Sequence, residues 1–164
     1  MLKIRPARMD DIGSITEIYN DAILHTTATF DTEPKSLEDQ KVWFLDHTSS
    51  FPVLVAELEG QVIGWASLSR WSNKKAYSQT VELSIYIDKP QRGKEFGRKL
   101  MEEIIKEGRK AGIHTILSRI AEGNEVSLHL HKVLGFELVG VMKEVGRKFD
   151  RLLDVHLMQR VFKK

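Results

Sequence analysis

Residues 80–100 read TVELSIYIDKPQRGKEFGRKL, and this stretch decides the fold of the chain. Its first eight residues alternate between polar and aliphatic side chains, so they predict a β-strand with two different faces. The aliphatic face is formed by Val81, Leu83, Ile85 and Ile87, and the polar face by Glu82, Ser84 and Tyr86. From the alternation alone, the polar face is more simply explained by solvent on one side of an antiparallel sheet than by a functional site.

A basic turn with two glycines joins this strand to a helix, which we expect over residues 94–111. The helix carries an apolar stripe formed by Phe96, Leu100, Met101, Ile104 and Ile105. Free N–H groups and the positive end of the helix dipole bind anions at such a helix start, and glycine lets a pyrophosphate approach the backbone. The pattern is neither a Walker P-loop nor a Rossmann fingerprint, so packing explains the turn as well as phosphate binding does.

The rest of the chain supplies strands and helices on both sides of this stretch. We expect strands at residues 2–8, 52–58, 62–70, 80–88, 113–120, 136–146 and 151–161. Helices are expected after Asp10-Asp11, which would cap the first of them, after Ser36, and over residues 94–111 and 124–134. The order β-αα-βββ-α-β-α-ββ predicts an α/β fold in which helices flank a central mixed, mostly antiparallel sheet. Without a repeat or linker, residues 1–164 are interpreted as a single domain.

The helix predicted for residues 124–134 has two stripes of interest. Its apolar stripe consists of residues 126, 130, 133 and 134, which we expect to face the core. Asn124, Ser127 and His131 fall together on another stripe, whereas His129 lies on a different side of the helix. A polar stripe on a surface helix is normally solvated, so these residues alone indicate no chemistry.

Composition excludes several classes of protein. The 25 Lys and Arg residues nearly balance the 23 Asp and Glu residues, and the two signs alternate, so no nucleic-acid partner is expected. The absence of cysteine excludes disulfides, thiolate-rich metal sites and a cysteine nucleophile, and no metal is predicted. No stretch approaches the roughly 20 apolar residues of a membrane span. We therefore expect a cytoplasmic protein without a membrane partner.

Taken together, these segments resemble the GNAT superfamily of N-acetyltransferases, and within it the phosphinothricin acetyltransferase-like branch. The resemblance covers nearly the whole chain. Each motif alone is weak evidence for the family, whereas the six motifs in their order along the chain are strong evidence. The motifs are Ile4-Arg5-Pro6-Ala7, Thr29-Phe30-Asp31-Thr32-Glu33-Pro34, the loop from Trp71 to Tyr77, the strand Thr80 to Ile87, Arg92-Gly93-x-x-x-Gly97, and Gly123-Asn124-x-x-Ser127 leading to Leu134-Gly135-Phe136. The resemblance implies the GNAT fold and an acetyl-CoA-dependent N-acetyltransferase.

The resemblance also implies where acetyl-CoA would bind. The strand would meet the acetyl and pantetheine portion, the turn would hold the pyrophosphate, and His131 would lie close to the sulfur. The implied cofactor contacts are Ile85, Tyr86, Ile87, Gly93, Lys94, Glu95, Phe96, Gly97, Arg98 and Asn124.

The sequence departs from the family pattern at two positions. Glu95 occupies the place of a turn glycine, where its carboxylate is favoured by the helix dipole and repelled by phosphate. We expect its side chain to turn to solvent and the affinity for acetyl-CoA to be modestly weakened. Leu153 stands where phosphinothricin enzymes have a histidine, and His156 is not expected to inherit that role.

Acetyl transfer requires a neutral amine, and free α-amino groups are largely protonated near pH 7, so a base is needed. Glu82 is the candidate, acting through water with a pKa raised by partial burial. Backbone N–H groups of residues 85–87 would stabilise the oxyanion. The thiolate would take its proton from His131, Tyr86 or water.

The resemblance places the acceptor beside Phe30, Trp71, Lys74, Lys75 and Tyr77. A cation in the Lys74-Lys75 loop would suit a carboxylate or a phosphinate, which points to phosphinothricin, methionine sulfoximine or methionine sulfone. The alternatives are an acetyltransferase for protein N-termini or polyamines, and a non-catalytic acyl-CoA-binding module. Homodimers are common in this branch, and we expect one here.

Overall fold

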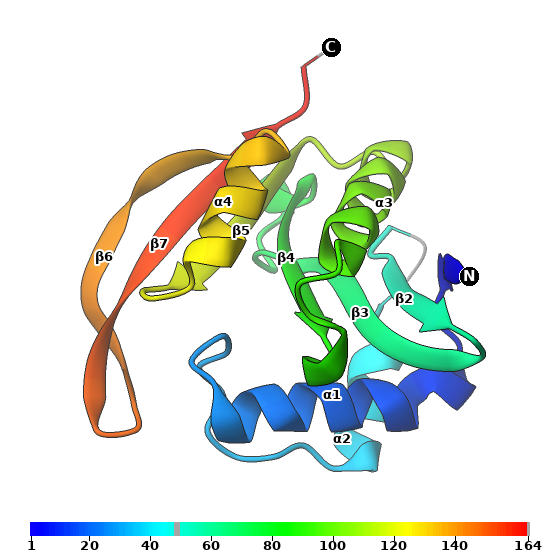
Figure 1. The fold of residues 1–164 in the computed structure, drawn as a ribbon. Coiled ribbons are helices and arrows are strands. Elements are labelled where there is room, and N and C mark those ends of the chain that lie inside the picture. The colour runs from blue at the N-terminus through cyan, green and yellow to red at the C-terminus, as the bar shows by residue number, and fades with distance from the viewer. Residues whose placement is uncertain (48–49, 164) are drawn as a thin grey trace.

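The computed structural model describes residues 1–47 and 50–163, which form a seven-stranded sheet with four α-helices (Figure 1). Along the sheet the strands follow the order β1-β2-β3-β4-β5-β7-β6. The strands are β1 Leu2–Pro6, β2 Val53–Leu58, β3 Gln61–Arg70, β4 Thr80–Ile87, β5 Thr115–Ala121, β6 Glu137–Lys148 and β7 Arg151–Val161. The helices are α1 Ile12–His25, α2 Leu37–Leu45, α3 Phe96–Lys110 and α4 Glu125–Val133. The predicted order of elements is confirmed.

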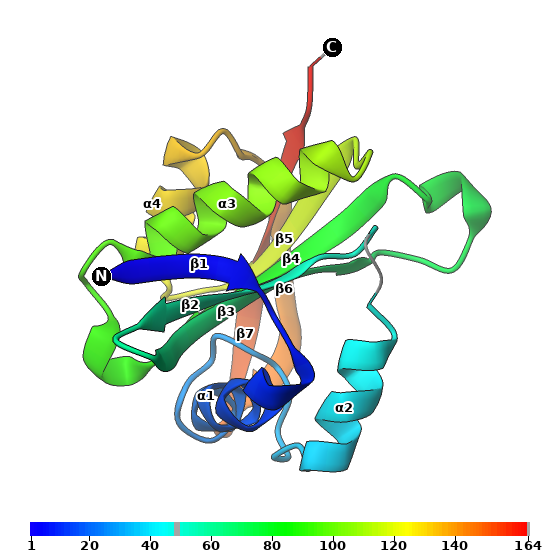
Figure 2. The ribbon, with the colours of Figure 1, turned by 90° about the vertical axis from the view of Figure 1, so that its right-hand side faces the viewer.

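Helices cover both faces of the sheet. Figure 2 shows α3 and α4 on one side and α1 and α2 on the other. Side chains of neighbouring residues in β2 separate accordingly: Leu54 and Ala56 join the core under α3, and Val55 joins the core under α1. Alternation along each strand therefore builds two apolar layers from one sheet.

The strands β4 and β5 form the only parallel pair among the described strands, and they pair only briefly. Their register runs from Thr80 opposite Thr115 to Glu82 opposite Leu117. Beyond these residues the two strands diverge (Figure 1). The sheet is thus split in its middle, immediately after Glu82.

Three local expectations are corrected. Asp11 occupies the N-cap position of α1 as expected, but its side chain makes no capping hydrogen bond to that helix. Met9–Asp11 form a 3-10 turn, and the Asp11 carboxylate instead accepts hydrogen bonds from Arg5 and from the backbone N–H of Arg8. The last turn is tighter than Gly146 to Asp150, because β6 continues to Lys148.

The third correction concerns α4. Its residues 126 and 133 were expected in the core, yet Val126 is 82% exposed and Val133 is 49% exposed. The buried residues of α4 are Leu128 and His131. The face that carries the histidine therefore packs on β5, and the two valines point outward.

Candidate active site

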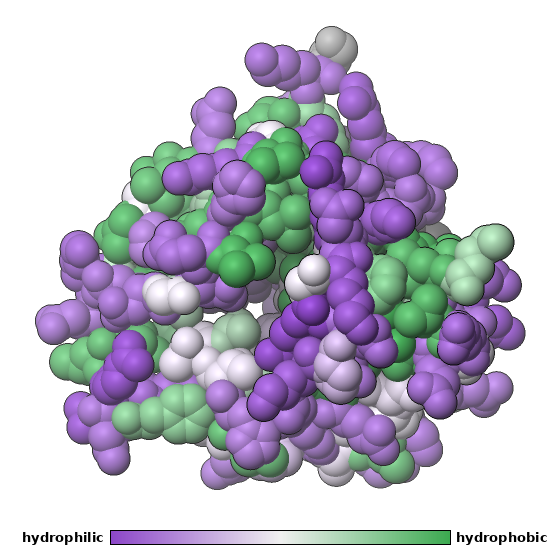
Figure 3. All heavy atoms as spheres, viewed as in Figure 1, coloured by the Kyte–Doolittle hydropathy of each residue, from purple (hydrophilic) through white to green (hydrophobic). Residues whose placement is uncertain are grey.

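A cavity of about 570 Å³ lies where the sheet is split. Its walls come from β4, β5 and α4, from residues 27–31 after α1, and from the β6–β7 hairpin. The space-filling view shows a hollow near the centre of this face, with hydrophilic side chains gathered beside it, over the turn that leads into α3 (Figure 3). The polar face predicted for the strand at 80–88 thus lines a cavity, since Glu82, Ser84 and Tyr86 are all in its wall.

Glu82 forms an ion pair with Arg119 in the cavity. Arg119 of β5 donates from Nη2 to one carboxylate oxygen at 2.7 Å and from Nε to the other at 2.5 Å, a bidentate pair. The hydrogen bond to Glu82 raises the pKa of Arg119. The expectation for Glu82 rested on burial alone, whereas the structure pairs its carboxylate with the guanidinium of Arg119.

Sequence reasoning missed Arg119. A signal was present, because Arg119 is the one charged residue in the strand Thr115–Ala121. Its side chain is 55% exposed, and its guanidinium lies over the ring of Trp71, 5.5 Å from the ring centre. Trp71 does not line the cavity itself, but it contacts Arg119, which does.

His131 is buried on the opposite side of the sheet from this ion pair. Its Nδ1 lies 2.7 Å from the carbonyl oxygen of Ser127, and its Nε2 lies 3.0 Å from the hydroxyl oxygen of Ser118. A carbonyl only accepts, so Nδ1 carries the proton and Nε2 accepts from Ser118. Burial also lowers the pKa of His131. The ring is therefore neutral, and its single N–H donates to the carbonyl oxygen of Ser127. This arrangement does not favour the predicted role of His131 as a direct proton donor to the cofactor's sulfur.

Tyr86 also lines the cavity and keeps its proton. Burial raises the pKa of its phenol to about 12. Its ring contacts the rings of Tyr19 and Trp65, with centroids 5.1 Å and 5.0 Å away. Tyr86 is thus a positioned O–H donor at neutral pH.

The segment 27–31 is held over the cavity by the β6–β7 hairpin. The buried ammonium of Lys148 donates to the carbonyl oxygen of Thr29 at 2.7 Å, and burial lowers the pKa of Lys148. The hydroxyl of Thr29 lies 3.0 Å from that of Tyr19, which also donates to Asp31. Phe30, expected at the acceptor, lines the cavity within this segment.

The turn between β4 and α3 lies at the wide end of the split. Gly93 and Glu95 have positive φ angles of 78° and 63°, and both are exposed. The left-handed conformation at Glu95 gives a physical reason for the glycine that the family pattern has there. Lys94 and Arg98 are exposed on the same turn, so positive side chains and the free N–H groups of α3 face solvent together.

The predicted cofactor and acceptor residues are only partly brought together. Ile85, Tyr86 and Asn124 line the cavity. The side chain of Ile87 instead packs against the core under α3, as does that of Phe96. A Cβ at Gly97 would lie 3.5 Å from Ile87, an ordinary contact.

The loop residues lie apart from the cavity. The segment with Lys74, Lys75 and Tyr77 is exposed, and Figure 2 shows the β3–β4 connection extending away from the sheet. None of the three is among the described residues that line the cavity. Among the described residues that line the cavity, Arg119 is the one with a permanent positive charge.

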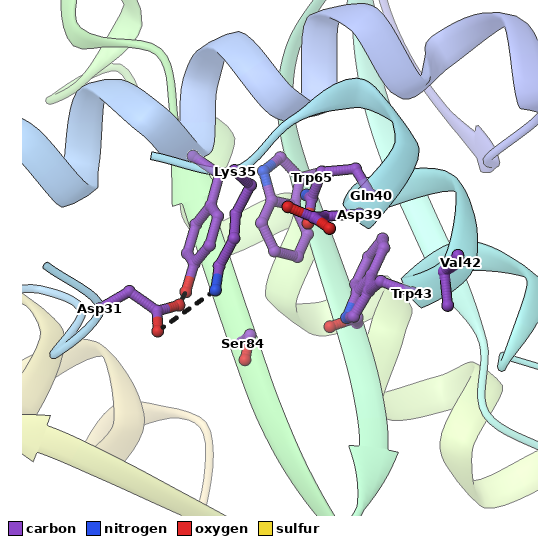
Figure 4. A pocket seen from close by; sticks show the side chains of 10 residues that line it. Asp31, Lys35, Asp39, Gln40, Val42, Trp43, Trp65 and Ser84 are labelled. Atoms are coloured by element: carbon purple, nitrogen blue, oxygen red, sulfur yellow. Dashed lines mark hydrogen bonds and ion pairs between the residues drawn. The ribbon is translucent and has the colours of Figure 1, made fainter. Parts of the chain in front are cut away.

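A second cavity, of about 580 Å³, adjoins the first on the α1–α2 side. Figure 4 shows its lining residues, among them Trp43 of α2 and Trp65 of β3, whose ring centroids lie 5.2 Å apart. Tyr19, Asp31 and Ser84 line both cavities, so the two are neighbours. Ser84 lies directly across from Ser67 of β3, which continues the polar face into the second cavity.

None of the helices in the described part of the chain has both the length and the apolar character needed to span a membrane. The described residues also contain no group of three or more His, Cys, Asp or Glu side chains placed to hold a metal ion.

Comparison with known proteins yields a consistent set. The family model described as "Acetyltransferase (GNAT) domain" matches residues 4–157. The chain is 40% identical to an L-amino acid N-acyltransferase of Escherichia coli, over 96% of this chain and 92% of that protein. It is also 40% identical to an L-methionine sulfoximine/L-methionine sulfone acetyltransferase of Pseudomonas aeruginosa, over 95% and 92% of the two chains.

A solved structure agrees with these sequence matches. A phosphinothricin acetyltransferase from Sinorhizobium meliloti, in complex with acetyl-CoA, superposes with a TM-score of 0.95 at 37% identity. The match covers 98% of this chain and 88% of that one. The predicted fold class is thereby confirmed.

Proposed function

Since the chain belongs to the GNAT family of acetyltransferases, we propose that residues 1–164 act as one domain that transfers an acetyl group from acetyl-CoA to the amino group of a small amino-acid-like acceptor. Acceptors of the phosphinothricin, methionine sulfoximine or methionine sulfone type are favoured by the names of the relatives. The observation that carries the proposal is the position of Glu82, at the point where β4 and β5 separate.

The residues fit acetyl-CoA along the split sheet. Ile85, Tyr86 and Asn124 line the cavity that would take the acetyl and pantetheine end. The exposed start of α3 suits the pyrophosphate, because its free N–H groups and the side chains of Lys94 and Arg98 are positive, although the carboxylate of Glu95 opposes them. When bound, acetyl-CoA supplies the activated acyl group.

Glu82 acts as the base in this proposal. Its carboxylate, held by Arg119, accepts a proton from the acceptor's ammonium, directly or through water. The neutral amine then attacks the acyl carbon, and backbone N–H groups beside Ile85 stabilise the oxyanion. Tyr86 is the favoured proton donor to the departing thiolate, because its phenol is protonated and lines the cavity, whereas the N–H of His131 is engaged by Ser127.

We also propose a cytoplasmic homodimer. The edge strand β6 is exposed along almost its whole length. Exposed apolar residues follow the hairpin, namely Leu138, Val139, Val141, Met142, Val145, Phe149 and Leu152. An unpaired edge with apolar side chains is a surface that a second copy would cover. Sedimentation equilibrium would test this state.

One assay tests the proposed activity. Release of the CoA thiol is measured with methionine sulfone, phosphinothricin, unmodified amino acids, a polyamine and a peptide. We expect turnover with the amino-acid-like acceptors. Turnover with none of them, despite acetyl-CoA binding measured by calorimetry, would indicate a non-catalytic module. Preference for the polyamine or the peptide would reassign the acceptor.

A further inference from the structure

We propose that the Glu82–Arg119 ion pair docks the zwitterionic head of a free α-amino acid, with Arg119 binding the α-carboxylate of the acceptor while Glu82 faces its amine. This inference rests on the proposed function and deepens it, because it selects the free acid over peptides, amides and polyamines.

The first support is the number of hydrogen-bond donors left on Arg119. A guanidinium has five N–H groups in a fixed fork. Glu82 engages one on Nε and one on Nη2, so the remaining donors, both of those on Nη1 among them, have no carboxylate partner among the described residues. The side chain is half exposed and lines the cavity. Arg119 can therefore bind a second carboxylate without releasing the first.

The second support is that the guanidinium is held in place. Glu82 fixes one edge of its plane, and Trp71 lies against its face at 5.5 Å. A planar cation held at edge and face loses little freedom on binding, which strengthens recognition of a carboxylate.

The third support is the distribution of charge around the cavity. Among the described lining residues, Arg119 is the permanent cation, while Asp31 and Glu82 are the acids. His131 is neutral, and the nearby ammonium of Lys148 is engaged by the carbonyl of Thr29. An α-carboxylate entering the cavity therefore finds one positive partner, beside the acid that would receive the proton of its amine.

Other acceptors would use this arrangement poorly. A polyamine would meet Arg119 with like charge, which is unfavourable. A peptide or an amide has no carboxylate next to its amine and would leave the free donors of Arg119 without an ionic partner. The ion pair therefore complements a free amino acid, whose ammonium and carboxylate are attached to the same carbon atom: Glu82 faces the ammonium and Arg119 faces the carboxylate.

The test compares two acceptors that share an amine: L-methionine sulfone and its carboxamide. With the wild-type protein we expect kcat/KM for the free acid to exceed that for the amide. In Arg119→Met, the KM for the acid should rise by roughly 10- to 100-fold, the loss of a charged hydrogen bond. The KM for the amide should change by less than about threefold, whereas any fall in kcat, caused by the loss of the group that holds Glu82, should be common to both acceptors. The substitution Arg8→Met, at an exposed arginine away from the cavity, is the matched control and should change neither.

Three outcomes would overturn the docking role. Equal kcat/KM for acid and amide in the wild type would do so while leaving the acetyltransferase activity intact. In Arg119→Met, a KM for the acid that does not rise, or that rises no more than the KM for the amide, would reduce Arg119 to a residue that positions Glu82. A rise in KM for the acid in Lys75→Met, with none in Arg119→Met, would assign the carboxylate to the loop.

Two further measurements keep the proposal testable. If Arg119→Met does not fold, as judged by circular dichroism, Arg119→Lys keeps the charge but loses the fork and should raise the KM for the acid by a smaller factor. If the wild type turns over no acceptor, the proposed function fails on its own. Calorimetric binding of the acid against the amide then tests the docking site, and equal affinities would reject it.

Discussion

The ring of Phe30 occupies the space that a side chain at Gly146 would need. A Cβ built on Gly146 would overlap three carbon atoms of the ring. The ring belongs to the segment over the cavity, and the glycine lies in β6, so the two elements are in direct contact. Together with the hydrogen bond from Lys148 to Thr29, this contact holds the segment 27–31 against the cavity that it lines.

Gly146→Ala should therefore displace Phe30. We expect a loss of about 1–3 kcal/mol in the free energy of unfolding, the usual cost of overpacking, together with a higher KM for the acceptor. Urea unfolding and steady-state kinetics would measure the two effects. Gly140→Ala is the control in the same strand, because nothing lies within 4 Å of its Cβ position. Equal effects at both glycines would contradict a specific contact with Phe30.

Glu82→Gln removes the proposed base. We expect kcat to fall by about 10²- to 10⁴-fold, and to fall most at low pH, where the acceptor amine is protonated and needs a base. Above the pKa of the amine the difference should narrow. The dissociation constant of acetyl-CoA should stay nearly unchanged. A kcat equal to that of the wild type across pH 6.5–9 would remove Glu82 from the mechanism.

The strand at 80–88 could be predicted because alternation encodes a two-faced strand directly. The sequence also identified Ser36 as a helix start, and Asp39 completes the reciprocal hydrogen bonds of that cap. Both features are local, since the interacting residues lie within a few positions of each other.

The facing of α4 could not be predicted, because it depends on a distant partner. His131 is buried since Ser118 of β5 and the carbonyl of Ser127 satisfy both ring nitrogens. Val126 would have been the better core residue by hydrophobicity alone, yet it is exposed. The ion pair of Glu82 was missed for the same reason: Arg119 lies on another strand.

The buried His131 predicts a dependence of stability on pH. Burial lowers its pKa below the ordinary value of 6.5, so the folded state disfavours the proton that the unfolded state binds. The contribution of the neutral His131 to the free energy of unfolding is complete above pH 6.5. It is lost as the pH falls from 6.5 toward the lower pKa that His131 has in the folded state. The slope from this one group is at most about 1.4 kcal/mol per pH unit.

Urea unfolding at several pH values between 7.5 and 5 would measure this slope. His131→Gln should lower stability at pH 7.5 and flatten the dependence below it. His129→Gln is the matched control, because His129 is exposed on the same helix, and it should keep the wild-type slope. A wild-type slope in His131→Gln would show that other groups carry the effect.

Glu95→Gly should strengthen binding of acetyl-CoA. The substitution removes a negative charge from the start of α3 and relieves a left-handed conformation, with φ of 63°, that disfavours every residue with a Cβ. We expect the dissociation constant, measured by calorimetry, to fall by roughly 3- to 10-fold, less at high salt because the charge effect is screened. The same change relieves strain worth about 1 kcal/mol.

Two controls separate charge from strain at this position. Glu59→Gly relieves a similar conformation, φ 51°, in the exposed turn between β2 and β3. It should affect stability without changing the affinity for acetyl-CoA, because this turn lies in a different part of the sheet. Glu95→Gln removes the charge and retains the strain, so its effect on affinity reports the charge alone. If Glu95→Gly and Glu95→Gln both leave the dissociation constant unchanged, Glu95 does not face the pyrophosphate, and the turn binds phosphate through its other residues or not at all.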